Sequence, residues 1–170
     1  MKQESNNQIL TPHFELSEFI ASPTALKHGI ANVPSPEAVD NLKRLCVHTL
    51  EPLREALRLP VVITSGFRTK ALNDLLAHSS ERSQHMQGQA ADFYVAPGQS
   101  GLSRRELLIK AFRLIITSEQ IDYDQLILYP TFIHVSFVSR ERNRRTILLG
   151  MRNGKLGYGK CSVENALKIS

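Results

Sequence analysis

Two histidines and one aspartate supply the side chains from which a metal site can be built. His85 and Asp92 lie seven positions apart in the segment Ser83–Asp92, and His134 follows within the apolar stretch Thr131–Phe137. Two imidazoles and one carboxylate can hold a divalent metal with a fourth position open, the arrangement that zinc hydrolases use to activate a water molecule. We therefore predict a metal site wherever folding brings these three side chains together.

The segment that contains His85 and Asp92 is predicted to be a loop that enters a strand. Gly88 and the alternating run Ala90–Val95 disfavour one continuous helix across it. Because successive side chains of a strand point to opposite faces, Asp92 would face the metal while its two neighbours face away. His134 would then project from an adjacent strand.

The remaining elements follow from helix caps, apolar spacing and β-branched runs. Helices are predicted at Leu16–Ser22, from Ser35 to Leu57 with an interruption at Pro52, at Lys70–Ala77 and at Ser103–Thr117, and strands at Leu59–Thr64, Ala90–Val95, Gln125–Leu128, Ile133–Val138 and Thr146–Met151. Asn153 and Gly154 indicate a tight turn. The expected fold class is α+β, with N-terminal helices packed on a small, mainly antiparallel sheet that carries a zinc site.

The length of 170 residues suits one domain with a single core. We expect a flexible lead-in over 1–12, the domain over 13–160 and a C-terminal tail over 161–170. No apolar stretch reaches the length of a membrane span. With only two cysteines, neither a disulfide framework nor a cysteine-based zinc knuckle is expected.

The chain carries a formal net charge of +5, which favours an anionic partner without choosing its class. Part of the surplus lies in Arg140–Arg145, which we interpret as a solvated turn between strands. Aromatic residues are not interleaved with the basic ones, as a groove for single-stranded nucleic acid would require. A basic nucleic-acid-binding module is therefore the last-ranked hypothesis.

Four segments carry patterns that belong together. The chain reads Ser-x-His-x-x-Gly-x-Ala-x-Asp at Ser83–Asp92 and Ser-Gly-Phe-Arg at Ser65–Arg68, and the other two segments are Phe132–Phe137 and Asp124–Ile127. In this combination they resemble the signature, the Ser-Gly-Tyr/Phe-Arg turn, the second histidine segment and a strand of one branch of the zinc D-Ala-D-Ala carboxypeptidase family, peptidase M15. Such proteins cleave peptide bonds near D-amino acids in bacterial cell-wall peptides.

The resemblance implies a cofactor, a substrate and roles for individual residues. Zn²⁺ would be held by His85, Asp92 and His134. Arg68 would clamp the scissile carbonyl oxygen or a peptide carboxylate, and Ser83 would bind substrate or cap its loop. The expected partners are peptidoglycan stem peptides, cleaved by D,D-carboxypeptidase or endopeptidase action. We expect a monomer with no membrane span and no nucleic-acid partner.

The chain departs from the family at the residue that transfers protons. Many of these enzymes carry Asp or Glu three residues before the second histidine, where this chain has Thr131. Threonine is not a base near neutral pH. Asp124 and Tyr129 are the candidate substitutes, and His78 or Glu81 could also be recruited. Two hypotheses follow: an active peptidase with a relocated acid/base, or a catalytically impaired zinc domain that binds cell-wall peptides.

The expected location depends on two opposing observations. A cell-wall peptidase has to reach the wall, yet the polar segment Met1–Asn7 has no apolar export signal. A cytoplasmic protein and one released during phage lysis, with action at the wall, both fit the sequence.

Overall fold

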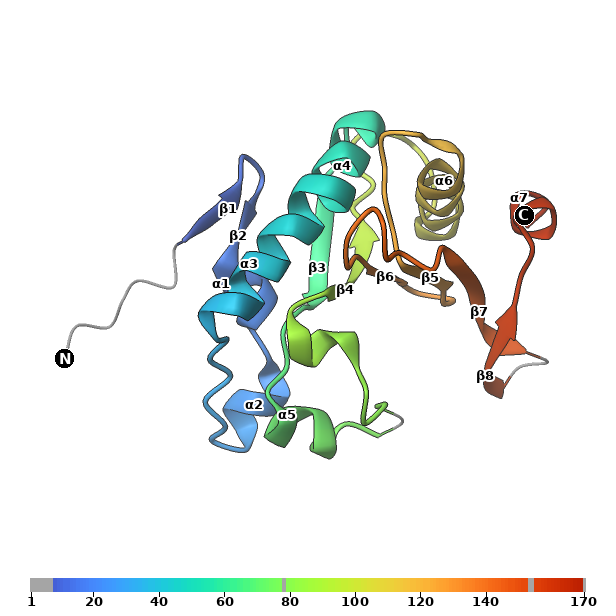
Figure 1. Ribbon diagram of the computed structural model, residues 1–170. Coiled ribbons are helices and arrows are strands. Elements are labelled where there is room, and N and C mark those ends of the chain that lie inside the picture. The colour runs from blue at the N-terminus through green and yellow to red at the C-terminus, as the bar shows by residue number, and fades with distance from the viewer. Residues whose placement is uncertain (1–7, 78, 153–154, 170) are drawn as a thin grey trace.

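The computed structural model describes residues 8–77, 79–152 and 155–169, which fold as helices packed on a central sheet (Figure 1). In chain order the elements are β1 (Ile9–Thr11), β2 (Phe14–Glu15), α1 (Leu16–Ile20), α2 (Pro23–Lys27), α3 (Pro36–Leu45), the π-helix η1 (Cys46–Leu50), α4 (Glu51–Leu57), β3 (Val61–Ser65), α5 (Lys70–Leu75), the 3₁₀ helix η2 (Gln84–Gln87), β4 (Ala90–Val95), α6 (Arg104–Thr117), β5 (Gln125–Leu128), β6 (Ile133–Ser136), β7 (Thr146–Arg152), β8 (Lys155–Lys160) and α7 (Val163–Leu167).

The main sheet has six strands in the order β3-β4-β6-β5-β7-β8. It is mainly antiparallel, as expected, but one parallel pairing makes it mixed. Strands β5 and β7 are parallel, whereas the other neighbouring strands are antiparallel. Strand β6 pairs with β4 along one edge and with β5 along the other, so it has no edge left for β7. Strand β7 therefore pairs with the other edge of β5 and runs in the same direction as β5. The predicted turn at Asn153 and Gly154 lies outside the described residues.

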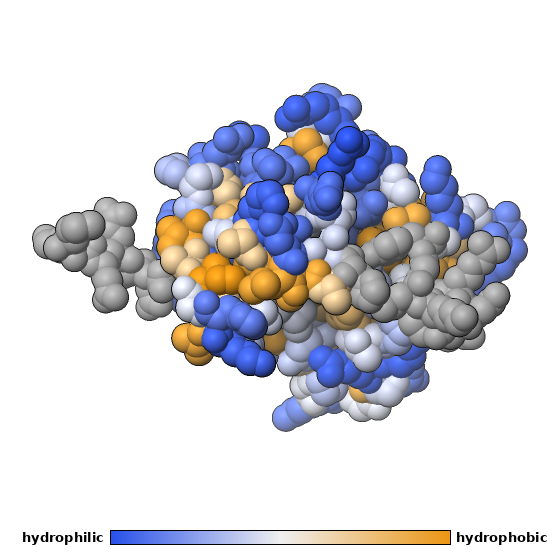
Figure 2. Space-filling model, turned by 90° about the horizontal axis from the view of Figure 1, so that it is seen from below, coloured by the Kyte–Doolittle hydropathy of each residue, from blue (hydrophilic) through white to orange (hydrophobic). Residues whose placement is uncertain are grey.

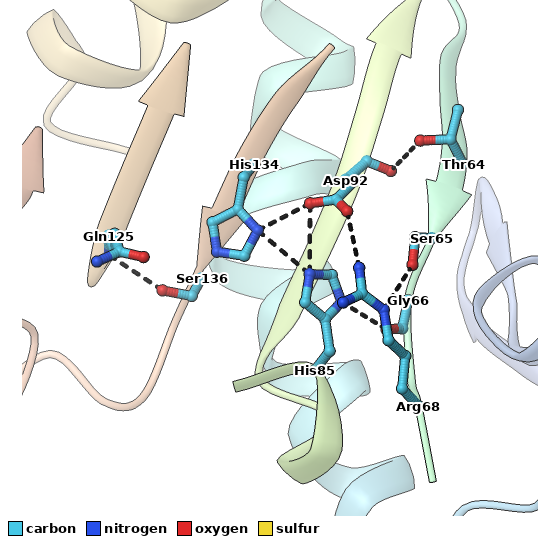
Figure 3. Close-up of polar contacts among 9 residues, drawn as sticks. All are labelled: Thr64, Ser65, Gly66, Arg68, His85, Asp92, Gln125, His134 and Ser136. Carbon is cyan, nitrogen blue, oxygen red and sulfur yellow. Dashed lines mark hydrogen bonds and ion pairs between the residues drawn. The ribbon is translucent and has the colours of Figure 1, made fainter. Parts of the chain in front are cut away.

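Helices α4 and α6 pack together, and α6 lies against β4 and β5. The core between them contains alternate residues of the central strands, including Ala91, Phe93, Ile133 and Val135. The intervening positions therefore point to the opposite face of the sheet, where Asp92 and His134 lie in front of the helices in Figure 3.

The long helical segment is interrupted as predicted, by the π-helix η1 immediately before α4. Proline has no N–H group to donate, and its ring disfavours a regular turn with the carbonyl four residues earlier. For Pro52 that carbonyl belongs to His48, which instead accepts a hydrogen bond from the backbone N–H of Asp122 at 2.9 Å. The interruption thus ties the helix to the segment that leads into β5.

The chain ends contribute to the described fold. Strand β1, within the expected lead-in, pairs with β2 and buries Leu10. Helix α7, within the expected tail, packs against α6 and buries Ala166. Each segment contributes a side chain to the same hydrophobic core as the central strands.

The face seen in Figure 2 is largely hydrophilic and includes an orange zone of apolar side chains. Among the exposed apolar residues are Leu26 and Val33, with 85% and 72% of their surface accessible. Within the described residues, no helix combines the length and apolar character that crossing a bilayer requires.

Candidate metal centre

Strands β4 and β6 place two of the three predicted ligands, Asp92 and His134, next to each other. In their antiparallel pairing, Asp92 lies directly opposite His134. Side chains at directly opposed positions share one face of the sheet, and their Cβ atoms lie about 5 Å apart. His134 Nδ1 is 2.8 Å from Asp92 Oδ1 (Figure 3).

His85 reaches the same point from the 3₁₀ helix η2, which replaces the irregular loop expected there. Gly88 ends this helix with φ +67°, and a Cβ at that position would lie 2.2 Å from the carbonyl oxygen of Ala38. Glycine therefore permits both the turn and the close approach to α3. The turn directs His85 Nε2 to within 3.3 Å of Asp92 Oδ1 and 3.2 Å of His134 Nδ1.

The other ring nitrogen of His85 fixes its orientation. His85 Nδ1 lies 2.6 Å from the carbonyl oxygen of Gly66. A carbonyl oxygen only accepts hydrogen bonds, so Nδ1 is the protonated donor and Nε2 keeps its lone pair toward the cluster. Metal-binding histidines commonly have such a partner on the distal nitrogen.

The electrostatic environment suits a metal-binding set. Burial lowers the pKa of His85 and outweighs the opposing effect of Asp92, so the imidazole favours the neutral form that binds metals. Burial alone would raise the pKa of Asp92. The two neighbouring imidazoles and their hydrogen bonds outweigh it and hold that pKa far below its usual value. Asp92 therefore stays ionised.

The three predicted ligands converge on one point. Each offers one ligand atom, and these atoms all lie within 4.8 Å of one another. Among the described residues, this is the group of histidine, cysteine and acidic side chains whose spacing could hold a metal ion. Two imidazoles and a carboxylate fit zinc with an open position, and the set contains no thiolate to favour softer metals.

Arg68 lies beside the cluster, and hydrogen bonds of its side chain and its backbone hold it in place. Its Nη2 donates to Asp92 Oδ2 at 3.1 Å, and its Nε donates to Ser65 Oγ at 3.1 Å. The backbone N–H of Arg68 donates to the carbonyl of His85. Burial lowers the pKa of Arg68 against the opposing effect of Asp92. The guanidinium still remains charged, because an arginine pKa starts far above neutrality.

Two further residues, Asn32 and Gly66, anchor the Arg68 turn. Asn32 Nδ2 donates to the carbonyls of Ile20 and Phe67, and its Oδ1 accepts from the backbone N–H of Thr69. A Cβ on Gly66 would lie 2.6 Å from Phe19, so only glycine fits there. No local sequence signal marks Asn32, because its partners come from distant segments.

The cluster opens into a pocket of about 960 Å³. Arg68, Ser83, His85, Asp92, Asp124, Tyr129 and His134 are on its wall. The structure thus brings these seven predicted site residues to one cavity. A volume of this size is typical of sites that bind small molecules or short peptides.

Asp124 is on this wall, but its carboxylate accepts several hydrogen bonds from neighbouring residues. Arg144 donates to both carboxylate oxygens through its side chain and to Oδ1 through its backbone N–H. Gln84 Nε2 adds a bond at 2.9 Å, and Ser136 Oγ lies 3.5 Å away. Burial would raise the pKa of Asp124, but these hydrogen bonds outweigh it and lower the pKa. Such a carboxylate is a poor proton acceptor near neutral pH.

Gln84 and Ser136 belong to this network. Ser136 Oγ also accepts from the backbone N–H of Gln125 at 3.0 Å (Figure 3). Gln84 Oε1 accepts from Arg144 Nη2 at 3.1 Å. Both residues therefore connect η2, β5 and β6 around Asp124.

Tyr129 lies on the pocket wall at the end of β5. Its ring stacks on Phe132 with 4.3 Å between centroids, and it acts electrostatically on Arg68. A Cβ on Gly150 would lie 2.3 Å from the tyrosine ring, so the ring packs where β7 has a glycine and no side chain. The ring is thus held by its surroundings, with Arg68 and the cluster on the same wall.

The other residues considered for proton transfer are less well placed. Glu81 is exposed and does not belong to the pocket lining. His78 lies outside the described residues. Among the described candidates for proton transfer, Tyr129 therefore has the most suitable position.

A family model described as peptidase M15 matches residues 12–136, nearly three quarters of the chain. The chain belongs to the peptidase M15 family. Comparison with curated proteins gave no match. Family membership supports a peptidase and peptide substrates, in agreement with the resemblance noted from the sequence. The peptidase M15 match includes Arg68 and all three residues of the cluster, but it ends before the arginines at 140–145.

Proposed function

We propose that this protein is a zinc-dependent peptidase that hydrolyses peptidoglycan stem peptides at the cell wall, as a D,D-carboxypeptidase or endopeptidase. The observation that carries the proposal is the convergence of His85, Asp92 and His134 on the wall of a large pocket in a peptidase M15 chain. When bound by these residues, zinc would supply a water of lowered pKa and polarise the carbonyl that is attacked.

The residues around the cluster would hold the ligands in place. The carbonyl of Gly66 orients His85, and the register of β4 and β6 sets Asp92 against His134. Arg68 donates to one oxygen of Asp92, which leaves the other oxygen directed at the two imidazoles. Preorganisation of this kind reduces the reorganisation needed when substrate binds.

Arg68 is also proposed to bind the substrate. Its guanidinium lies on the pocket wall beside the ligands, so its remaining N–H groups can donate to a scissile carbonyl oxygen or a terminal carboxylate. Stabilising negative charge that develops on the carbonyl oxygen would lower the barrier to hydrolysis. Ser83, which is on the same wall, is proposed to donate a hydrogen bond to the peptide backbone.

Tyr129 is proposed to take part in proton transfer or to bind the substrate near the bond that is cleaved. A hydroxyl both donates and accepts hydrogen bonds, so it can pass a proton to the leaving amine. Tyr129 and Arg68 lie on the wall of the same pocket as the three ligands. The ion pair with Arg144 disfavours Asp124 for this role.

The decisive experiment is digestion of purified peptidoglycan, with and without a metal chelator, followed by mass spectrometry of the soluble and bound peptides. We expect chelator-sensitive shortening of stem peptides, lost in His134→Ala and retained in His28→Ala, an exposed histidine away from the pocket. The mass change identifies the bond. Unchanged peptides in the presence of zinc-loaded protein would refute the peptidase.

Two observations favour a second function, a zinc domain that binds cell-wall peptides without turnover. The position three residues before His134 holds Thr131, and the buried Asp124 is committed to an ion pair. Retained zinc and measurable binding of stem peptides, together with no cleavage, would support this alternative.

A further inference from the structure

The pocket that contains the candidate metal centre has an excess of positive charge. Among the described residues, six charged side chains other than histidine line it: Arg68, Arg82, Arg142, Arg144, Asp92 and Asp124. Arg68 pairs with Asp92 at 3.1 Å, and Arg144 pairs with Asp124. The two aspartates are thus balanced by two arginines, and the charges of Arg82 and Arg142 remain.

These two arginines come from loops on different parts of the chain. Arg82 lies between α5 and η2, and Arg142 lies between β6 and β7. The loops are joined because Arg144 donates to Gln84 and both residues bind Asp124. The network that removes Asp124 from proton transfer therefore also positions the two loops that carry Arg82 and Arg142.

The charged neighbours of these loops do not cancel the excess inside the pocket. Glu141 precedes Arg142, and its pKa is lowered first by a hydrogen bond from Ser139 and then by the charges of Arg140 and Arg142. Its side chain is exposed and is not part of the lining. Ser79, Ser80 and Ser83 are also on the wall, so hydroxyl donors accompany the two cations.

We propose that Arg82 and Arg142 form an anion-binding subsite that takes a side-chain carboxylate of a peptide, separate from the carbonyl or terminus held near Arg68. The inference rests on the proposed peptidase function and deepens it, because it assigns acidic peptides as the preferred substrates. A guanidinium matches the planar geometry of a carboxylate and can bind both oxygens. The pocket volume of about 960 Å³ has room for more than one residue of such a peptide.

The test compares two synthetic peptides that end in D-Ala-D-Ala and differ only by glutamate or glutamine further along the chain. The zinc-loaded full chain is assayed with both. Where the peptides are cleaved, the ratio of kcat/KM gives the preference, and where they are not, calorimetry gives the ratio of Kd. We expect the glutamate peptide to be favoured about five- to tenfold at low salt, the sum of two partly exposed ion pairs.

The variant Arg82→Gln/Arg142→Gln should reduce the preference to below about twofold, since both ion pairs are removed. Arg44→Gln/Lys110→Gln is the matched control, because it removes two exposed positive charges from α3 and α6, away from the pocket. It should retain the preference. Raising the salt to about 0.5 M should shrink the preference of the wild type, because exposed charges are screened.

The outcomes separate this inference from the proposed function. A wild type that cleaves or binds both peptides equally overturns the subsite, whatever its activity. A preference that persists in Arg82→Gln/Arg142→Gln overturns it as well. Binding of the glutamate peptide with the expected preference but without cleavage supports the subsite and refutes the peptidase.

Discussion

Asp92 and His134 are directly paired residues of two antiparallel strands, and their side chains meet at 2.8 Å on the face of the sheet opposite the helices. A shift of one residue in this register would turn one of the two side chains into the hydrophobic core. The neighbouring core residues Ala91, Phe93 and Val135 prevent that shift, because it would expose them. Packing of the core therefore fixes the geometry of the metal site.

Asp92→Asn should reduce zinc affinity by on the order of 100-fold or more, since loss of even an indirect partner of a ligand typically costs 10–100-fold. The amide lacks the negative charge that Asp92 presents to the two imidazoles. Metal content after dialysis against a fixed zinc concentration provides the measurement. Asp40→Asn, an exposed change on α3, should bind zinc normally. Equal zinc content in wild type and Asp92→Asn would remove Asp92 from the site.

Tyr129→Phe should lower kcat by about 10²–10⁴-fold if the hydroxyl transfers a proton, with zinc content unchanged. Phenylalanine keeps the stacking on Phe132 and the packing against Gly150, so only the oxygen is lost. A rise in KM at unchanged kcat would instead indicate substrate binding. The control is Tyr94→Phe, which removes a hydroxyl from β4 outside the pocket lining. Wild-type kcat and KM in Tyr129→Phe would exclude both roles.

Gly150→Ala should displace the Tyr129 ring, because the added Cβ would lie 2.3 Å from it. We expect a loss of activity similar to that of Tyr129→Phe, together with an overpacking cost of about 1–3 kcal/mol in unfolding free energy. Kinetics and chemical denaturation measure the two effects. Gly159→Ala, where an added Cβ meets no atom within 4 Å, should change neither. Full activity in Gly150→Ala would show that activity does not depend on the position of the Tyr129 ring.

Arg144→Ala should destabilise the fold by about 1–3 kcal/mol, because it leaves the buried carboxylate of Asp124 with fewer donors. The partners of Asp124 lower its pKa in the folded state, so its contribution to stability is complete above the unfolded pKa of about 3.9. The contribution is lost as the pH falls through the lower folded pKa. Thermal unfolding of wild type and variant should therefore differ most near pH 7 and converge in strong acid.

The sequence predicted several local elements because their signals involve near neighbours. Ser103 and Glu106 form a reciprocal cap at the start of α6, and Ser35 with Pro36 begins α3. The alternation in Ala90–Val95 correctly predicted that Asp92 would face away from its neighbours. The parallel pairing of β5 with β7 was not predicted, because strand order depends on which sheet edge is vacant.

The amino-acid sequence by itself determined the ligand types, the strand that carries Asp92 and the missing acid at Thr131, since these depend on residue identity and local spacing. The tertiary structure alone decided that Asp124 is bound by Arg144, that Asn32 anchors the Arg68 turn and that Tyr129 lies in the pocket. Each of these depends on residues that are distant in the chain. Such contacts form only when the whole core packs, because their partners carry no mark in the local sequence.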